Sequence, residues 1–221
     1  MRVRIKFTKE ESVKFLGHLD ILRTFQKFMN RAQVLMEYSE GFNPHQKMSF
    51  ALPLGLGLTS KAEYVDAFIA DGQDLNKVRD SLNKVSGIGF QFLIVKELKE
   101  NAIKSMAAVK YADFTVETTD KIFTENEISD FLNQEEILAE KKSKSGIKTV
   151  DIKPMIIDLK PYDKGLKLRL TAGSVNNLKP ETLLIALYNF LGLEYQRNNC
   201  KIERAELLCE NFIALENYQT V

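Results

Sequence analysis

The first hundred residues alternate between hydrophobic patterns of period two and period 3.6, and this alternation restricts the fold more than any other feature. Val3, Ile5 and Phe7 alternate with cationic side chains, which is typical of a half-buried strand. An amphipathic helix is predicted next, at about residues 19–32. Strands at 47–51 and 64–69, a helix at 75–85 and a strand at 88–98 are expected to follow. The order βαββαβ is that of a ferredoxin-like sandwich, in which two helices cover one face of an antiparallel sheet and leave the other open.

The second half of the chain repeats this plan more weakly. Strands are predicted at 111–118, 152–159, 166–171 and 202–208, and helices at 125–132 and 180–191. Thr124 and Glu127 have the spacing of a capping box, and Pro180 suits the first turn of a helix. The predicted fold class is therefore α+β, with two tandem ferredoxin-like (βαββαβ) domains with antiparallel sheets, at residues 1–104 and 105–221.

Composition excludes several classes of protein. The hydrophobic share of 44% and charged share of 28% are those of a soluble globular protein. Lysine plus arginine (31) nearly balances aspartate plus glutamate (30), so nucleic-acid binding would depend on local patches. Cys200 and Cys209 form neither a disulfide framework nor a metal cluster. With no long apolar run and no signal-peptide core, we expect a cytoplasmic protein without membrane contact.

A turn-rich stretch at residues 38–51 contains the strongest candidate site. His45 could act as an acid or base near neutral pH, Lys47 could hold a phosphate, and Tyr38 could stack or donate a hydrogen bond. Together they would suit the binding or the cleavage of an RNA backbone. The plain alternative is that His45 caps a loop and Lys47 is a solvated strand residue. His18, before the first helix, could offer a neutral ring to a substrate or only cap that helix.

A second candidate is a lysine-rich segment in the other half of the chain, predicted to be a flexible basic loop that reaches for phosphates or is merely solvated. The predicted binding residues are His18, Asp20, Tyr38, Phe42, Asn43, His45, Lys47, Lys141, Lys142, Lys144, Lys148 and Lys153. The catalytic candidates among them are His45, Lys47, Tyr38 and His18. Two histidines without a third ligand nearby do not make a zinc site, so no metal and no cofactor is expected.

Several segments resemble a bacterial family of uncharacterised radical SAM-linked proteins. The segments are Lys14–Asp20, Tyr38–Phe50, Glu63–Asp66 and Gly146–Pro154. The resemblance implies a B12-binding-type radical SAM protein as partner, and the gene neighbourhoods of that family favour an RNA-related role. The chain departs from the family at Gln46, where a second proline is expected after the histidine. With only two cysteines, it lacks the three-cysteine motif of a radical SAM enzyme itself.

Three functions stay open from the sequence. The first is a non-enzymatic accessory protein that binds RNA, or another phosphate-bearing substrate, for a radical SAM partner. The second is a metal-independent endoribonuclease similar to CRISPR RNA-processing enzymes, with His45 as acid or base and Lys47 stabilising the charged phosphorane. The third is a protein–protein interaction module with an exposed apolar patch. That patch would be supplied by Leu52, Leu54, Leu56 and Leu58.

Overall fold

The structure is a computed structural model that describes residues 1–143 and 146–221, without the side chains of 141–143 and 147. The described residues form a mixed α+β fold with mostly antiparallel strands and five α-helices. By its internal contacts the chain divides into unit 1, residues 1–110 with 206–221, and unit 2, residues 111–205. Residues 206–221 thus group with unit 1, whereas the sequence predicted them in a domain at residues 105–221. Every helix in the described ranges is too short or too polar to span a lipid bilayer.

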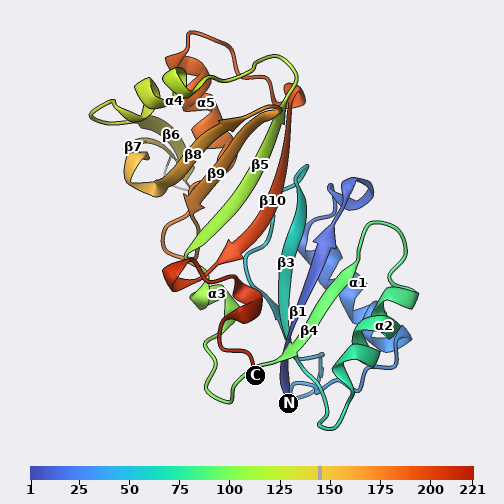
Figure 1. The fold of residues 1–221 in the computed structure, drawn as a ribbon. Coiled ribbons are helices and arrows are strands. Elements are labelled where there is room, and N and C mark those ends of the chain that lie inside the picture. Colours follow the sequence, from blue (N-terminus) through green and yellow to red (C-terminus); the bar gives the residue numbers. More distant parts are fainter. Residues whose placement is uncertain (144–145) are drawn as a thin grey trace. The chain divides into compact units, whose positions relative to one another are not determined.

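Unit 1 contains the sequence of elements expected for the first half of the chain. Its elements are β1 (Arg2–Lys9), α1 (His18–Arg31), β2 (Met48–Phe50), β3 (Thr59–Phe68), α2 (Leu75–Val85), β4 (Phe92–Glu97) and α3 (Ser105–Ala108). Strand β1 pairs antiparallel with both β3 and β4, and β2 pairs with β3. Helices α1 and α2 lie on the same side of these strands (Figure 1). The short helix α3 was not predicted from the sequence.

The core of unit 1 follows from the alternation along β1. Val3, Ile5 and Phe7 are at most 1% exposed and pack in one cluster with side chains of α1 and α2, including Phe25 and Leu82. The ring centroids of Phe7 and Phe25 lie 4.5 Å apart. Burying a side chain of this size stabilises the folded state by roughly 1.5–3 kcal/mol, so β1 and α1 anchor the unit.

The opposite face of β1 is not open, which corrects the expectation of a solvent-facing basic surface. Arg4 is 1% exposed, and its Nε donates to Asp66 Oδ1 at 2.8 Å. Its Nη1 donates to the carbonyl oxygens of Leu215 and Tyr218, each at 2.9 Å. Since a buried guanidinium must have its donors satisfied, the C-terminal segment is required over this face.

The charge on Asp66 is balanced from several sides. Arg2 Nη2 donates to Asp66 Oδ2 at 2.8 Å, and the backbone N–H of Ser105 donates to the same oxygen at 3.1 Å. Arg2 also donates to the carbonyl oxygen of Ala102. The carboxylate therefore holds the start of β1 and the N-terminal end of α3 in place.

A second polar cluster lies further along the same face. Lys6 Nζ is 2.7 Å from both Glu206 Oε2 and Glu216 Oε2, and the Tyr64 hydroxyl donates to Glu206 Oε1 at 2.6 Å. Burial alone would lower the pKa of Lys6, but its hydrogen bonds to the two carboxylates outweigh burial and the net pKa is raised. Burial and the Glu206 charge raise the pKa of Tyr64. This lysine therefore joins β1 to the C-terminal segment.

Unit 2 is built from a further set of strands and two helices. Its elements are β5 (Tyr111–Thr118), α4 (Glu125–Leu132), β6 (Leu138–Ser143), β7 (Gly146–Asp151), β8 (Ile156–Tyr162), β9 (Gly165–Thr171), α5 (Pro180–Phe190) and most of β10 (Cys200–Leu208). The strand order is β10-β5-β9-β8, and β6 pairs with β7 in a separate two-stranded sheet. Short 3₁₀ helices occupy Lys153–Met155 and Arg197–Asn199 in unit 2, and Glu11–Val13, Glu210–Phe212 and Leu215–Asn217 in unit 1. A tandem ferredoxin-like arrangement stays a prediction.

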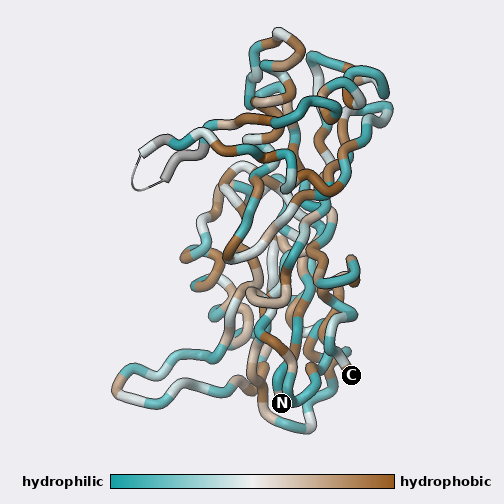
Figure 2. The backbone as a smooth tube through the Cα atoms, turned by 90° about the vertical axis from the view of Figure 1, so that its left-hand side faces the viewer, coloured by the Kyte–Doolittle hydropathy of each residue, from teal (hydrophilic) through white to brown (hydrophobic). Residues whose placement is uncertain are grey.

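The lysine-rich segment is not simply the flexible loop that its composition indicated. Residues 138–143 and 146–151 form the antiparallel strands β6 and β7, with Lys141 opposite Lys148. This hairpin extends away from the rest of its own unit in Figure 2. By contrast, the capping box is confirmed, because the Thr124 hydroxyl accepts from the Glu127 N–H and the Glu127 carboxylate accepts from the Thr124 N–H.

The buried Arg4–Asp66 pair yields a stability prediction. Arg4→Met should lower the free energy of unfolding by about 3–5 kcal/mol, because it leaves a buried carboxylate with fewer donors and two carbonyl oxygens unpaired. Denaturant unfolding of the variant measures this. Arg23→Met, at an exposed position, should change stability by less than about 0.5 kcal/mol. A cost of Arg4→Met below about 1 kcal/mol would contradict the account.

The raised pKa of Lys6 yields a prediction about alkaline stability. A lysine whose pKa is raised on folding stabilises the native state fully below its ordinary value of 10.5, and this contribution is lost as pH rises toward the folded pKa. Wild-type stability should therefore fall above pH 10.5 more steeply than that of Lys6→Met. Unfolding titrations at a series of alkaline pH values measure the two slopes. Lys77→Met, at an exposed position on α2, should keep the wild-type slope, and equal slopes for Lys6→Met would refute the assignment.

Candidate functional site

Residues 36–48, here called the 36–48 hairpin, form a narrow antiparallel projection from unit 1. Tyr38 pairs with Gln46, the Lys47 N–H donates to the Glu37 carbonyl at 2.9 Å, and the Ser39 N–H donates to the His45 carbonyl at 2.8 Å. At its base, Glu37 and Lys47 exchange backbone hydrogen bonds with Phe68 at the end of β3. Gly41, near the tip, has a φ of 107° that side-chain-bearing residues rarely adopt. These local hydrogen bonds hold residues 36–48 in a hairpin.

His45 and Lys47 both have partners inside the hairpin. His45 Nδ1 lies 2.9 Å from the Ser39 hydroxyl, and the His45 N–H donates to the same oxygen at 3.1 Å. Lys47 Nζ lies 3.3 Å from Glu37 Oε2 and 5.9 Å from the centroid of the Phe68 ring. Both side chains are exposed, so these contacts orient them and still leave each accessible to a ligand.

The tip of the hairpin presents aromatic and amide groups to solvent. Phe42 is fully exposed, Tyr38 is 49% exposed and Asn43 is exposed. An exposed phenyl ring gains nothing in stability where it stands, whereas it offers a flat surface for stacking. The hairpin therefore combines stacking surfaces, a cation and an imidazole on one open element.

Gln46 connects the hairpin to α1. It is buried, its Nε2 donates to Asn30 Oδ1 at 2.7 Å, and its Oε1 has no hydrogen-bond partner. A proline at this position, as expected from the family resemblance, would lack the side-chain amide that makes this bond. The departure from the family pattern thus has a local role in this chain.

His18 lies apart from His45. It is the first residue of α1, exposed, with its ring edge-on to Phe50 at a centroid distance of 5.4 Å. Phe50 follows His45 by five positions along an extended stretch, which corresponds to roughly 16 Å. No contact found among the described residues joins the two histidines, so His18 stands apart from the three catalytic candidates on the hairpin.

The acidic candidate Asp20 joins no cluster of acidic side chains among the described residues. Asp20 is exposed, with Arg23 at 3.9 Å, whereas Asp66 is enclosed by arginines. Within the described part of the chain, no group of three histidine, cysteine or acidic side chains has the arrangement of a metal site.

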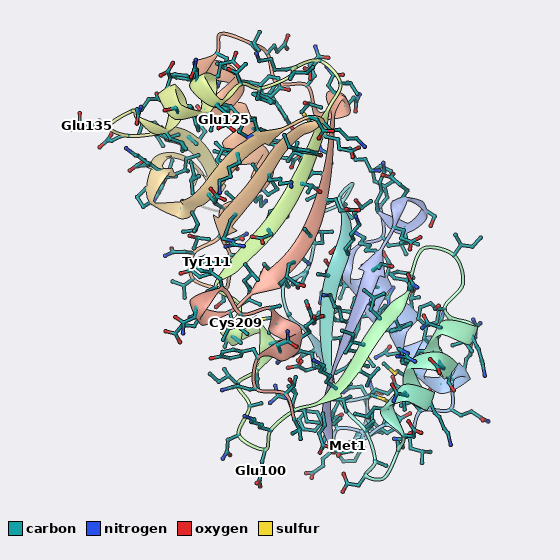
Figure 3. All side chains as sticks on the ribbon, in the orientation of Figure 1. Met1, Glu100, Tyr111, Glu125, Glu135 and Cys209 are labelled. Carbon is teal, nitrogen blue, oxygen red and sulfur yellow. The ribbon has the colours of Figure 1, made fainter. Side chains whose placement is uncertain are left out.

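Both thiols are poor nucleophiles. Cys200 and Cys209 are free and buried; Cys209 follows β10 (Figure 3). Burial raises the pKa of Cys200, and it raises the pKa of Cys209 to about 12. Since the reactive species is the thiolate, neither residue is suited to nucleophilic catalysis near neutral pH.

The basic residues of unit 2 do not form one described cluster. Lys141 and Lys142 belong to β6, but their side chains, and all of Lys144, lie outside the described residues. Lys148 is exposed on β7. Lys153 Nζ donates to the carbonyl oxygen of Gln134 at 2.5 Å, which gives it a structural role.

Three surface features were not assigned a function from the sequence. A ridge of cations, Arg23, Lys27 and Arg31, lies on the exposed side of α1. Their i, i+4, i+8 spacing was the available signal. The exposed apolar side chains of this part of unit 1, here called the apolar patch, are Phe15, Leu19 and Leu56, at 62–73% exposure, and only Leu56 belonged to the predicted leucine patch. A pocket of about 890 Å³ in unit 2 is lined by the first residues of β6, by α5 and by residues 173–179.

Solved structures include distant matches to this chain. The chain resembles part of a structure described as "Crystal Structure of a Cbf5-Nop10-Gar1 Complex", with 10% identity and a TM-score of 0.47. The match covers 93% of this chain and 48% of the other, so the chain spans about half of its length. At this level the similarity supports no conclusion about fold or function. No curated protein matches the chain.

A protein-family match identifies the family of this chain. One family model matches residues 2–180, which is most of the chain. Its description states no activity, ligand or partner. The chain therefore belongs to the family described as an uncharacterized protein conserved in bacteria (DUF2344).

Proposed function

We propose that this chain is a non-enzymatic accessory protein that binds RNA, or another phosphate-bearing ligand, at the 36–48 hairpin. The observation that supports this most strongly is the combination of a fully exposed Phe42 with Tyr38, His45 and Lys47 on one projecting element. Exposed aromatic rings stack on unpaired bases, and an exposed lysine attracts phosphate.

The same geometry favours binding over catalysis. His45 Nδ1 is held by Ser39, and Lys47 is paired with Glu37. Neither interaction couples the two to each other, and His18 lies against Phe50 instead. General acid–base cleavage requires groups placed on opposite sides of one reacting phosphate in a site that excludes water. An open hairpin tip meets neither condition, so the endoribonuclease hypothesis has the weaker support.

A protein-docking role is a second candidate, and one observation favours it. The Gly57 N–H donates to the Lys14 carbonyl at 3.0 Å, which brings the loop carrying Leu56 beside Phe15. Leu58 is buried instead, and Leu52 and Leu54 are half-buried, so only Leu56 of the predicted leucine patch is exposed. We propose that this apolar patch contacts the partner protein. The family resemblance of the sequence suggests a B12-binding-type radical SAM protein in that role.

The binding proposal predicts a selective effect of the hairpin tip. Phe42→Ala should weaken binding to single-stranded RNA roughly tenfold, because base–aromatic stacking contributes about 1–3 kcal/mol per base. Fluorescence anisotropy in EDTA measures the affinity, and gel analysis of the same samples detects cleavage. Phe15→Ala, which removes another exposed ring of unit 1, is the matched control and should bind as wild type does.

Two outcomes would count against this proposal. Absence of RNA binding by the wild-type protein at low salt would remove the hairpin proposal. Discrete cleavage products that disappear in His45→Ala, with binding retained, would establish a ribonuclease instead.

The docking proposal predicts a separate defect. Leu19→Ser combined with Leu56→Ser should abolish co-elution with the purified radical SAM partner, because two exposed apolar contacts are lost. RNA binding should be unchanged. Leu35→Ser, at a position that is 62% exposed, is the control. Unchanged complex formation by the double variant in size-exclusion chromatography would exclude this patch as the docking surface.

A further inference from the structure

The exposed side of α1 presents a straight row of cations. Arg23, Lys27 and Arg31 are all exposed and occur at every fourth residue. Side chains at this spacing share one helix face, and successive members are about 6 Å apart along the axis. The three charges therefore form a ridge of nearly regular spacing on unit 1, here called the α1 ridge.

The stability of α1 does not explain why all three cations are present. Cations at i and i+4 repel one another, so the row works against helix formation. Arg31 lies in the last turn, where a positive charge favours the helix dipole, but Arg23 and Lys27 do not gain from that effect. Arg23 has only an exposed carboxylate, Asp20, at 3.9 Å, and no carboxylate pairs with Lys27 or Arg31 in the described structure.

The ridge and the 36–48 hairpin are held together at one point. The buried amide of Gln46 donates to Asn30, and Asn30 directly precedes the last cation of the ridge. Asp20 lies at the far end of the ridge, Glu37 is paired with Lys47, and the hairpin also carries the exposed Glu40. The C-terminal end of the ridge is therefore adjacent to the hairpin that carries the exposed rings.

We infer that the α1 ridge holds the phosphodiester backbone of a single-stranded nucleic acid whose bases stack on Phe42 and Tyr38. This inference rests on the proposed function and specifies its ligand as a polymer. Regularly placed cations neutralise successive phosphates, and exposed aromatic rings accept unpaired bases without strong sequence preference. A duplex keeps its bases stacked internally, so it would use the ridge without the rings.

The salt dependence of binding tests the inference directly. The variant Arg23→Gln/Lys27→Gln/Arg31→Gln removes the ridge, and the probe is a short labelled oligouridylate. For single strands each neutralised phosphate contributes about 0.7 to the slope of log affinity against log salt, so the variant should lose a slope of about 2. Lys77→Gln/Lys84→Gln/Lys99→Gln removes three exposed charges elsewhere on unit 1 and should keep the wild-type slope.

Each outcome separates the inference from the proposed function. Wild-type binding with an unchanged slope in the ridge variant overturns the ridge assignment and leaves the hairpin proposal standing. Equal slope losses in both triple variants overturn it too, since they show a response to total charge alone. A duplex that competes as well as the single strand overturns the single-strand assignment. If the wild-type protein does not bind the oligouridylate, both the ridge assignment and the hairpin proposal are wrong. Circular dichroism of the variants confirms that these exposed substitutions leave the fold intact.

Discussion

The ion pair between Arg4 and Asp66 is the interaction on which unit 1 depends. It links the first strand to the third, and through the carbonyl oxygens of Leu215 and Tyr218 it draws the C-terminal segment over the face that the helices leave uncovered. A buried arginine without these acceptors would be costly, so residues 215–218 stabilise the position of Arg4 in β1. This pair explains why residues 206–221 group with unit 1.

Helices cover one face of the unit 1 strands, and the C-terminal segment covers part of the other. The exposed candidate residues of unit 1 therefore lie on its periphery. The 36–48 hairpin leaves the end of β3 with its aromatic tip in solvent, and Gln46 fastens it to Asn30 of α1. Exposed rings and cations on a fixed surface suit the recognition of an extended polyanion. They do not suit a reaction that requires exclusion of water.

The sequence predicts what is local and misses what depends on distant contacts. The alternation of Val3, Ile5 and Phe7 and the Thr124–Glu127 capping box involve neighbouring residues, and the structure contains both. The burial of Arg4 could not be foreseen, because its carbonyl partners are 211 and 214 residues away. Strands β6 and β7 were not predicted, because they are rich in lysine. A two-stranded ribbon needs little of the apolar alternation by which strands are recognised in a sequence. The candidate residues of the hairpin were recognised from the sequence by their chemical type. The exposure and the partner of each side chain depend on the fold and could not be predicted.

The most direct test of the account is to map the binding surface of the wild-type protein in solution. Backbone amide chemical shifts, recorded during titration with a short single-stranded oligoribonucleotide, would report every residue that senses the ligand. We expect the changes to concentrate in residues 36–48 and along α1, with few in unit 2. Changes concentrated around the pocket or the β6–β7 hairpin of unit 2, with the 36–48 hairpin unaffected, would contradict the central claim.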